Sequence, residues 1–319
     1  MADRMIERKG IMAKRNGGKK RGSLFLLFGA AAGMLAFALT RRSLARRSWS
    51  TPGERGDGRA VAVVTGASSG IGAAYARLLA SYGYNLALVG RRGERLQALA
   101  DELQKIYKVK AEAVIADLSD LNEIERVGQY IAQIPDLEVL VNNAGFGATG
   151  HFTTLDPTIP VEMTHVHDVA MVRLSRAALP SLLKRKHGAI VNVASVAAFA
   201  PLAGDATYAA TKSYMVTFSE ALAAELRGTG VRVQALCPGF TVTEFHRRPL
   251  MKGFERRWIP KFMWMSADDV VRSSFHALRN GQVVHVPGPF YKLASIVLRA
   301  PLISPLIQEF ASVAVNRQT

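Results

Sequence analysis

The chain has 319 residues, of which 49% are hydrophobic and 21% are charged, a balance typical of a globular protein rather than a disordered one. Its single cysteine, Cys237, excludes an internal disulfide, and no residues have the spacing of a structural zinc site, so we expect no metal. The formal net charge is +16, and residues 1–59 contribute +10 of it, from 14 lysines and arginines against 4 acidic residues. A basic arm alone suggests nucleic-acid binding only weakly, and no nucleic-acid-reading motif accompanies it, so we expect no nucleic-acid partner.

The first 58 residues fall into a basic arm over 1–22, an apolar segment over 23–39 and a basic, flexible linker over 40–58. The apolar segment holds 17 residues without a charge, which is at the short limit for a membrane-spanning helix. We expect it to anchor the protein at a membrane. Basic residues flank it on both sides, so charge does not set its orientation. A cleaved or organelle-targeting peptide, and a start that does not enter a membrane, are the alternatives.

A glycine-rich turn, TGASSGIG, occupies residues 65–72, between an apolar run at 60–64 and a predicted helix over 71–82. A strand, a glycine turn and a helix in succession are the context of a dinucleotide-binding turn; a merely flexible loop is the alternative. Glycines there allow the tight bend, the approach of the backbone to a pyrophosphate and close packing of the helix on the strand. The candidate cofactor contacts in this turn are Gly66, Ser68, Ser69, Gly70, Ile71 and Gly72.

Strand and helix patterns alternate beyond this turn. Short runs rich in Val, Ile and Leu predict six further strands, at 85–89, 110–115, 139–141, 189–194, 232–237 and 282–286. Helical periodicity predicts five further helices, at 93–106, 121–133, 161–185, 207–227 and 267–279. Apolar strands separated by helices are typical of a parallel sheet covered on both faces. We therefore predict an α/β fold: one catalytic domain over 59–290, built on a Rossmann-type, doubly wound parallel sheet of about seven strands.

A tyrosine and a lysine, Tyr208 and Lys212, lie four residues apart in YAATK, and Ser195 precedes this motif. Positions i and i+4 share one face of a helix, so both side chains can point into one site. We expect the lysine cation to favour the phenolate and so lower the pKa of Tyr208. Such a tyrosine can exchange a proton with a carbonyl or alcohol oxygen, and the serine hydroxyl can bond the same oxygen.

Taken with NNAG at 142–145 and Pro238-Gly239, these motifs resemble those of the short-chain dehydrogenase/reductase family in order and spacing. The resemblance covers roughly residues 59–290 and points to the NADPH-preferring ketoreductases. It implies an oxidoreductase that interconverts a carbonyl and an alcohol, and it implies no single substrate. Residues 244–265, described below, lead us to expect a hydrophobic substrate of lipid, acyl or steroid-like type. Tyr208 would act as general acid and base, Ser195 would stabilise the oxygen, and Lys212 would support both tyrosine and cofactor.

The resemblance also implies which residues meet the cofactor. Gly90 stands where NAD-preferring relatives usually carry an acid, and Arg91 and Arg92 follow it, so we expect NADP(H) rather than NAD(H). Arg91 is expected to be the main contact of the 2′-phosphate and Arg92 a helper; two solvated loop arginines are the alternative. The remaining expected contacts are Asp117, Leu118, Asn143, Ala144, Gly145, Tyr208, Lys212, Pro238, Gly239, Thr243 and, as a substitute for the last, Thr241. The need for NADP(H) leads us to expect the catalytic domain on the cytoplasmic side.

One position departs from the family pattern. Many relatives carry an asparagine in the helix after NNAG, where it supports a proton-relay water, and here His167 takes that place. A histidine can donate or accept through either ring nitrogen, so it can replace the relay; a helix histidine that only packs is the alternative. With His167 as its hint, a catalytically weak NADPH-binding sensor or scaffold at the membrane is our alternative function.

Two late segments bear on substrate and partners. Residues 244–265 are rich in aromatic, methionine and basic residues, which favours a lid over an apolar substrate; an ordinary helix pair is the alternative. The apolar tail over 291–319, interrupted by Pro301 and Pro305, predicts an interfacial segment or a part that packs on its own domain or on a second subunit. By resemblance we expect a homo-oligomer, a dimer or tetramer, formed through the helices near 161–185 and 207–227.

Overall fold

The chain divides into two compact units, residues 1–48 and 49–319. The computed structural model describes residues 49–247, 250–251, 257 and 259–298, all within the second unit. The predicted basic arm and membrane anchor lie outside the described residues. Among the helices that are described, none has the length and apolar character needed to cross a bilayer.

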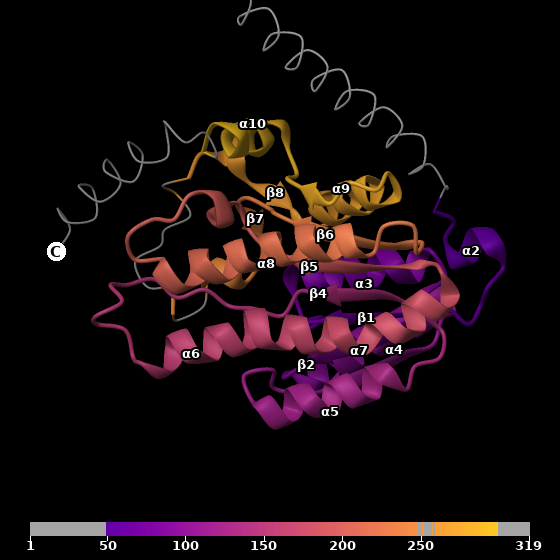
Figure 1. Ribbon diagram of the computed structural model, residues 1–319. Helices are drawn as coiled ribbons and strands as arrows, with labels where there is room; N and C mark the ends of the chain where they lie inside the picture. Colours follow the sequence, from indigo (N-terminus) through magenta and orange to yellow (C-terminus); the bar gives the residue numbers. More distant parts are fainter. Residues whose placement is uncertain (1–48, 248–249, 252–256, 258, 299–319) are drawn as a thin grey trace, which may run out of the picture. The chain divides into compact units, whose positions relative to one another are not determined.

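Seven parallel strands form the central sheet, in the order β3-β2-β1-β4-β5-β6-β9 (Figure 1). They are β1 (Val61–Thr65), β2 (Asn85–Gly90), β3 (Ala111–Ile115), β4 (Leu137–Asn142), β5 (Gly188–Val193), β6 (Val231–Leu236) and β9 (Val284–His285). A second parallel pair, β7 (Thr241–Val242) and β8 (Met265–Ser266), lies beside the sheet. This confirms the predicted fold class and all seven predicted strands, of which the last is shorter than expected.

Helices cover both faces of the sheet (Figure 1). Their bounds are α2 (Pro52–Arg55), α3 (Gly70–Ser81), α4 (Gly93–Tyr107), α5 (Leu121–Ala132), α6 (Thr158–Thr164), α7 (Ala170–Arg185), α8 (Ala206–Glu225), α9 (Ala267–Arg279) and α10 (Pro289–Leu298). Helices α3, α4 and α9 pack on one face, and α5, α7 and α8 pack on the other. The connections therefore alternate between the two faces, as a doubly wound sheet requires.

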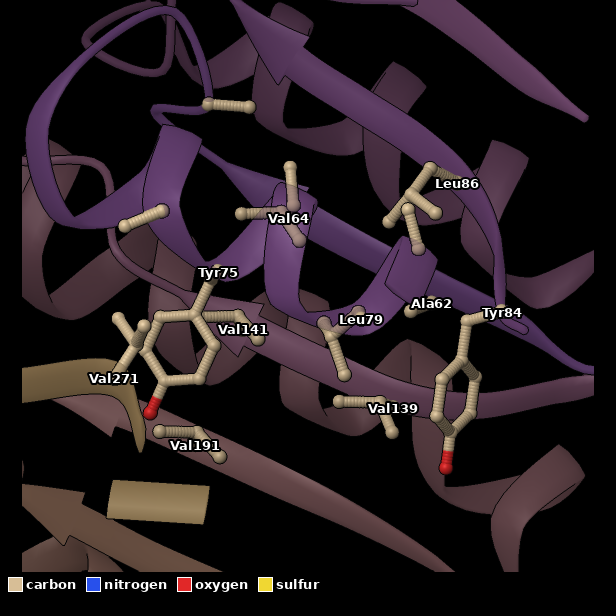
Figure 2. Close-up of a cluster of buried hydrophobic side chains, with 14 of the residues drawn as sticks. Ala62, Val64, Tyr75, Leu79, Tyr84, Leu86, Val139, Val141, Val191 and Val271 are labelled. Carbon is tan, nitrogen blue, oxygen red and sulfur yellow. The ribbon is translucent and has the colours of Figure 1, made fainter. Parts of the chain in front are cut away.

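Strand residues alternate between two apolar cores. Ala62 and Val64 of β1 face α3 and α9, whereas Val63 faces the core under α5, α7 and α8. Figure 2 shows the first core, where Tyr75 and Leu79 of α3 lie over the β1 and β4 side chains. Because both faces are covered, every β1 residue from Ala62 to Thr65 is buried, which explains the uninterrupted apolar run in the sequence.

Local signals set the ends of the predicted helices. Asp120 caps α5 by accepting a hydrogen bond from the Asn122 backbone N–H, and Ser266 caps α9 by accepting one from Asp269. Helix α4 stops at Lys108, which adopts a left-handed conformation. The long helix predicted over 161–185 is instead interrupted: a π-helical turn, η1 (His165–Val169), separates α6 from α7. Such turns occur often at functional sites, and this one contains His167.

The predicted linker is wrong in its second half. Trp49 is 2% exposed and stacks on His187 at 4.4 Å, with the Arg232 guanidinium 5.4 Å from the indole ring. Thr51 and Glu54 form a capping box on α2, which fixes the next turn of chain. The folded unit therefore begins at Trp49, because a buried indole and a stable cap hold a stretch whose Ser, Gly and Pro content suggests flexibility.

The predicted boundary at residue 290 also needs correction. Helix α10 extends to Leu298, and its Tyr291 is 6% exposed. The Tyr291 hydroxyl donates to the Met263 carbonyl oxygen at 2.7 Å and accepts from the Phe240 N–H at 3.1 Å. The first part of the apolar tail thus packs on its own domain, which was one of the expected alternatives. Residues 299–319 lie outside the described residues.

Candidate active site

The carboxyl ends of the strands carry a cavity of about 950 Å³. It lies where β1 and β4 are neighbours, the point at which the strand order reverses and where open α/β sheets bind ligands. All predicted site residues line this cavity except Gly72 and His167. Those that do are Gly66, Ser68, Ser69, Gly70, Ile71, Arg91, Arg92, Asp117, Leu118, Asn143, Ala144, Gly145, Ser195, Tyr208, Lys212, Pro238, Gly239, Thr241 and Thr243.

The glycine turn has the geometry that its sequence predicts. Gly66 and Gly70 have φ angles of +65° and +57°, in the left-handed region that favours glycine. A Cβ atom on Gly72 would lie 2.4 Å from the Gly66 carbonyl oxygen, so only glycine allows α3 to start this close to β1. Asn143 fastens the turn by donating to the carbonyl oxygen of Thr65 at 2.8 Å. Gly72 and Asn143 thus shape the turn.

Ser195, Tyr208 and Lys212 come from two neighbouring elements. Ser195 follows β5 and caps a 3-10 turn, where its Oγ accepts from the Ala197 N–H at 3.1 Å and keeps its own hydrogen to donate. Tyr208 and Lys212 lie one turn apart on α8, with the Lys212 Nζ 5.7 Å from the tyrosine ring centroid. Lys212 is 5% exposed, and its Nζ donates to the Val193 carbonyl oxygen at 3.0 Å.

The structure contradicts the expectation that Tyr208 has a lowered pKa. Burial raises the pKa of Tyr208 to about 12; Ser195 lowers it in part and the charge of Asp205 adds to the rise. Burial also lowers the pKa of Lys212 to about 8, against the charge of Asp168, which favours its protonation. Desolvation is therefore the largest effect on both side chains. Tyr208 is protonated throughout the physiological range.

His167 does not have a relay geometry. Its Nε2 accepts a hydrogen bond from the Phe146 N–H at 3.2 Å, so the proton of the neutral ring lies on Nδ1. Nδ1 then donates to the Thr211 Oγ1 at 2.8 Å, and Thr211 donates to the Tyr208 carbonyl oxygen at 3.0 Å. Burial holds the pKa of His167 well below its ordinary value, which keeps the ring neutral. Both nitrogens are engaged, so His167 joins the loop after β4 to α8 and positions Tyr208.

The two arginines after β2 have different partners in the structure. Arg92 faces the glycine turn: its Nε and Nη2 donate to the Ser68 Oγ at 3.0 and 2.9 Å, and Nη2 donates to the Ser69 Oγ at 2.6 Å. Arg91 is more exposed and forms an ion pair with Asp117 at 3.4 Å. The side chain in contact with the turn is therefore that of Arg92, whereas Arg91 pairs with Asp117 instead.

Three functional candidates escaped the sequence patterns. Tyr291 lines the cavity from α10, and its ring lies against Gly239, where a Cβ atom would come within 2.2 Å of the ring. Glu244 pairs with arginines of α4 and its preceding loop. Asp168 lies in the π-helical turn, and its Oδ1 is buried with no hydrogen-bond partner among the described residues. Burial raises the pKa of Asp168 to about 7, against the charge of Lys212. No motif marks such long-range contacts.

The cavity has an apolar end beyond the tyrosine. It is lined there by Phe146, Leu202, Phe240, Phe245, Met263 and Leu298. The Phe245 and Tyr208 rings lie 6.0 Å apart, so the apolar walls begin next to the phenol. The β7–β8 pair brings the two ends of the segment over 244–265 together. The described parts of this segment include the 3-10 turns Phe245–Arg247 and Lys261–Met263, and they do not form the helix pair that was the alternative.

The residues present fit a nicotinamide dinucleotide. The glycine turn leaves no room for Cβ atoms at Gly66 or Gly72, and it begins α3, whose first N–H groups attract a pyrophosphate. Arg92 and the two serine hydroxyls supply donors at the edge of the same cavity, as a phosphate requires. The cavity continues from these donors to Tyr208 and Lys212.

Several known proteins are similar to this chain. The family model for short chain dehydrogenases matches residues 60–250. The 3-oxoacyl acyl-carrier-protein reductase of Aquifex aeolicus is 31% identical over 241 residues, which are 72% of this chain and 97% of that protein. The human inactive hydroxysteroid dehydrogenase-like protein 1 is 36% identical over 184 residues, which are 57% of this chain and 56% of that protein.

Among solved structures, the short-chain dehydrogenase from Sphingobium yanoikuyae in complex with NADPH is 32% identical, with a TM-score of 0.68 over 74% of this chain and 92% of that one. The two proteins therefore share a fold as well as sequence similarity. The chain therefore belongs to the short-chain dehydrogenase/reductase family and is an oxidoreductase that acts on CH–OH and C=O groups.

Proposed function

We propose that this protein uses NADP(H) to interconvert a carbonyl and an alcohol on a hydrophobic substrate of lipid, acyl or steroid-like type. One observation carries the proposal: a single cavity runs from the Arg92 and Ser68 donors, past Tyr208 and Lys212, to apolar walls. The donors suit a 2′-phosphate, and the walls suit a greasy substrate whose carbonyl reaches the tyrosine. When bound, NADPH supplies the hydride.

The chain's own residues stabilise the charge that develops on the substrate oxygen and supply its proton. The Ser195 Oγ accepts a hydrogen bond from the Ala197 N–H through a lone pair. This leaves its hydroxyl hydrogen available to donate to the substrate oxygen. Tyr208 carries its proton at neutral pH, because burial raises its pKa to about 12, and gives it to the oxygen as negative charge develops there. The nearby Lys212 ammonium stabilises the resulting phenolate. Thr211 and His167 hold the α8 backbone at Tyr208 in place.

The test is oxidation of NADPH and NADH by the full-length protein with a panel of hydrophobic ketones and 3-oxoacyl thioesters. We expect turnover with NADPH that falls at least about 100-fold in Tyr208→Phe, as expected for loss of a general acid. Tyr214→Phe is the matched control, because Tyr214 lies on the same helix but is 46% exposed. Equal turnover in the two variants would refute the role of Tyr208.

A catalytically weak NADPH-binding sensor or scaffold is the competing candidate. It is favoured by one finding, that the human relative with 36% identity is named as inactive. The present chain, however, keeps Ser195, Tyr208 and Lys212 around one cavity. Tight NADPH binding with no turnover on any carbonyl or alcohol in the panel would favour the sensor.

We further propose that residues 23–39 attach the protein to a membrane, with the catalytic domain on the cytoplasmic side where NADP(H) is available. The described part adds support near the cavity: Phe262 is 73% exposed and meets the Phe290 ring at 5.7 Å, and Leu293 of α10 is 65% exposed. The full-length protein should resist extraction from membranes by alkaline carbonate, and Leu27→Arg with Leu35→Arg should release it. Complete extraction of the unmodified chain would contradict attachment.

A homo-oligomer is proposed through α7 and α8. Tyr214 of α8 and Leu183 of α7 are exposed apolar side chains on these helices, which a second copy would cover. Light scattering after size exclusion should give a dimer or tetramer, and Tyr214→Arg should shift it toward the monomer. A monomer for the unmodified chain would rule the proposal out.

A further inference from the structure

Glu244 forms a bridge between two parts of the cavity rim. Its carboxylate accepts from the Arg92 Nη1 at 2.8 Å and from the Arg95 Nη1 at 2.9 and 3.0 Å. The arginines lie at the start of α4, whereas Glu244 follows β7, about 150 residues later in the chain. One carboxylate thus ties the loop after β2 to the segment that borders the substrate end of the cavity.

The same Arg92 guanidinium faces the glycine turn. Its remaining donors reach Ser68 Oγ and Ser69 Oγ, so Glu244 and the two serines together occupy its edges. A 2′-phosphate bound beside Ser68 needs these edges, because a guanidinium binds a phosphate through the same paired N–H groups that it offers to a carboxylate. Glu244 and the phosphate are therefore alternative partners of Arg92.

The position of Glu244 is set by its neighbours in the chain. The Thr243 side chain packs over Gly70, where a Cβ atom would lie 3.0 Å from its methyl carbon. The Phe245 ring is fixed next to Tyr208 and close to Gly147. Between these two contacts the Glu244 side chain points along the rim toward the arginines, and pairing with them lowers its pKa, so it stays ionised at neutral pH. The carboxylate is a standing negative charge at the phosphate site.

We propose that Glu244 is a specificity-determining residue that competes with the cofactor's 2′-phosphate for Arg92 and Arg95 and so limits the preference for NADP(H) over NAD(H). The inference rests on the proposed function in that it takes the arginine end of the cavity as the 2′-phosphate site. NAD(H) lacks the phosphate, so its binding leaves the Glu244 bridge intact. NADP(H) must displace the carboxylate from at least one arginine, and it also meets the repulsion between the two anions.

The test measures dissociation constants of the full-length protein for NADP⁺ and NAD⁺, and for the fragments 2′,5′-ADP and 5′-AMP, which differ only in the 2′-phosphate. Glu244→Gln removes the charge and keeps the shape of the side chain. We expect it to tighten NADP⁺ and 2′,5′-ADP binding about three- to tenfold, the scale of an exposed ion pair plus the relieved repulsion. Binding of NAD⁺ and 5′-AMP should change less than about twofold.

Glu94→Gln is the matched control. Glu94 is an exposed acid next to Arg95, so its substitution changes the net charge equally without touching the bridge. A second control is Arg92→Gln with Arg95→Gln: in that background Glu244→Gln should lose most of its effect on 2′,5′-ADP, because both shared partners are gone. A structural effect of Glu244 on the loop would not depend on the two arginines in this way.

Three outcomes would overturn the inference. The first is weaker NADP⁺ binding in Glu244→Gln, which would mean that the carboxylate orients Arg92 for the phosphate. The others are equal tightening of NAD⁺ and NADP⁺ binding in Glu244→Gln, and the same gain in NADP⁺ affinity in Glu94→Gln. Failure of the proposed function looks different. If the unmodified protein binds no dinucleotide, or if it binds 2′,5′-ADP no more tightly than Arg92→Gln does, the 2′-phosphate site itself is refuted.

Discussion

Lys212 should make the protein less stable while it makes the chemistry possible. Burial lowers the pKa of Lys212 from its ordinary value of 10.5 to about 8. At about 1.4 kcal/mol per pH unit, keeping this side chain charged in the folded protein at pH 7 costs roughly 3 kcal/mol. Lys212→Met keeps most of the apolar stem but removes the charge. It also removes the hydrogen bond to the Val193 carbonyl, worth about 1 kcal/mol, so we expect a net gain of about 2 kcal/mol.

The sign of this effect depends on pH. The folded protein holds the lysine at a lower pKa than the unfolded chain does, so the cost is complete below pH 8 and disappears as the pH rises through 10.5. Thermal denaturation in detergent micelles should therefore give Lys212→Met a midpoint about 5 °C higher at pH 7. At pH 10.5 the midpoint should be about 2–3 °C lower than that of the unmodified protein, because the cost of the charge has nearly gone and the loss of the hydrogen bond to Val193 remains. The variant should also lose turnover, which is the trade expected at an active site.

Lys105→Met is the control for this experiment, because Lys105 is an exposed lysine of α4 and its loss should not change the midpoint. A Lys212→Met variant that is less stable than the unmodified protein at pH 7, or equally stabilised at both pH values, would refute the reasoning. The first result would mean that the hydrogen bond and packing of the lysine outweigh its desolvation. The second would mean that the ammonium is not the origin of the gain.

Three further predictions concern stability and pH. Trp49→Ala should lower the free energy of unfolding by about 3–5 kcal/mol in urea titrations, since it empties a buried indole site, whereas the exposed Phe262→Ala should change it little. Tyr291→Phe should cost about 1–2 kcal/mol by the same measurement and raise KM more than it lowers kcat, because two hydrogen bonds that hold the substrate end are lost; unchanged KM would contradict this. The rate of carbonyl reduction should fall as the pH rises through about 8 and Lys212 loses its proton. In Asp168→Asn that fall should begin at a lower pH, because the Asp168 charge favours the ammonium; an unshifted profile in stopped-flow assays would remove Asp168 from the site.

Local rules were sufficient for the framework of the fold. Strands buried on both faces are mainly apolar, so they can be recognised in the sequence as short runs of Val, Ile, Leu and Ala, as β1 illustrates. The glycine turn is equally local, because positive φ angles and the contact between Gly72 and the Gly66 carbonyl admit no side chain. The pairing of Tyr208 with Lys212 follows from helix periodicity alone.

Other features depend on contacts between distant parts of the chain. The local sequence around Trp49 predicts a linker, but the Trp49 ring is buried against His187 and Arg232, which lie far away in the chain. No local pattern reveals these contacts. Arg91 and Arg92 are indistinguishable in sequence, and only the course of the loop over Ser68 decides which of them meets the turn. From the sequence, His167 is expected to replace the asparagine of a proton relay. Its contacts with Phe146 and Thr211 show that it instead holds neighbouring parts of the chain in position.

The family, the alternating elements and the chemistry-bearing side chains follow from residue type and short spacing, so the sequence was enough to predict them. The ionisation of those side chains, and the partners they contact, depend on how distant parts of the chain pack together. Burial, which depends on the whole fold, raises the pKa of Tyr208 although a cation lies one helical turn away. Desolvation acts over the full surroundings of a group, whereas spacing describes only one neighbour, and so the protonation state of this site could not be read from the motif.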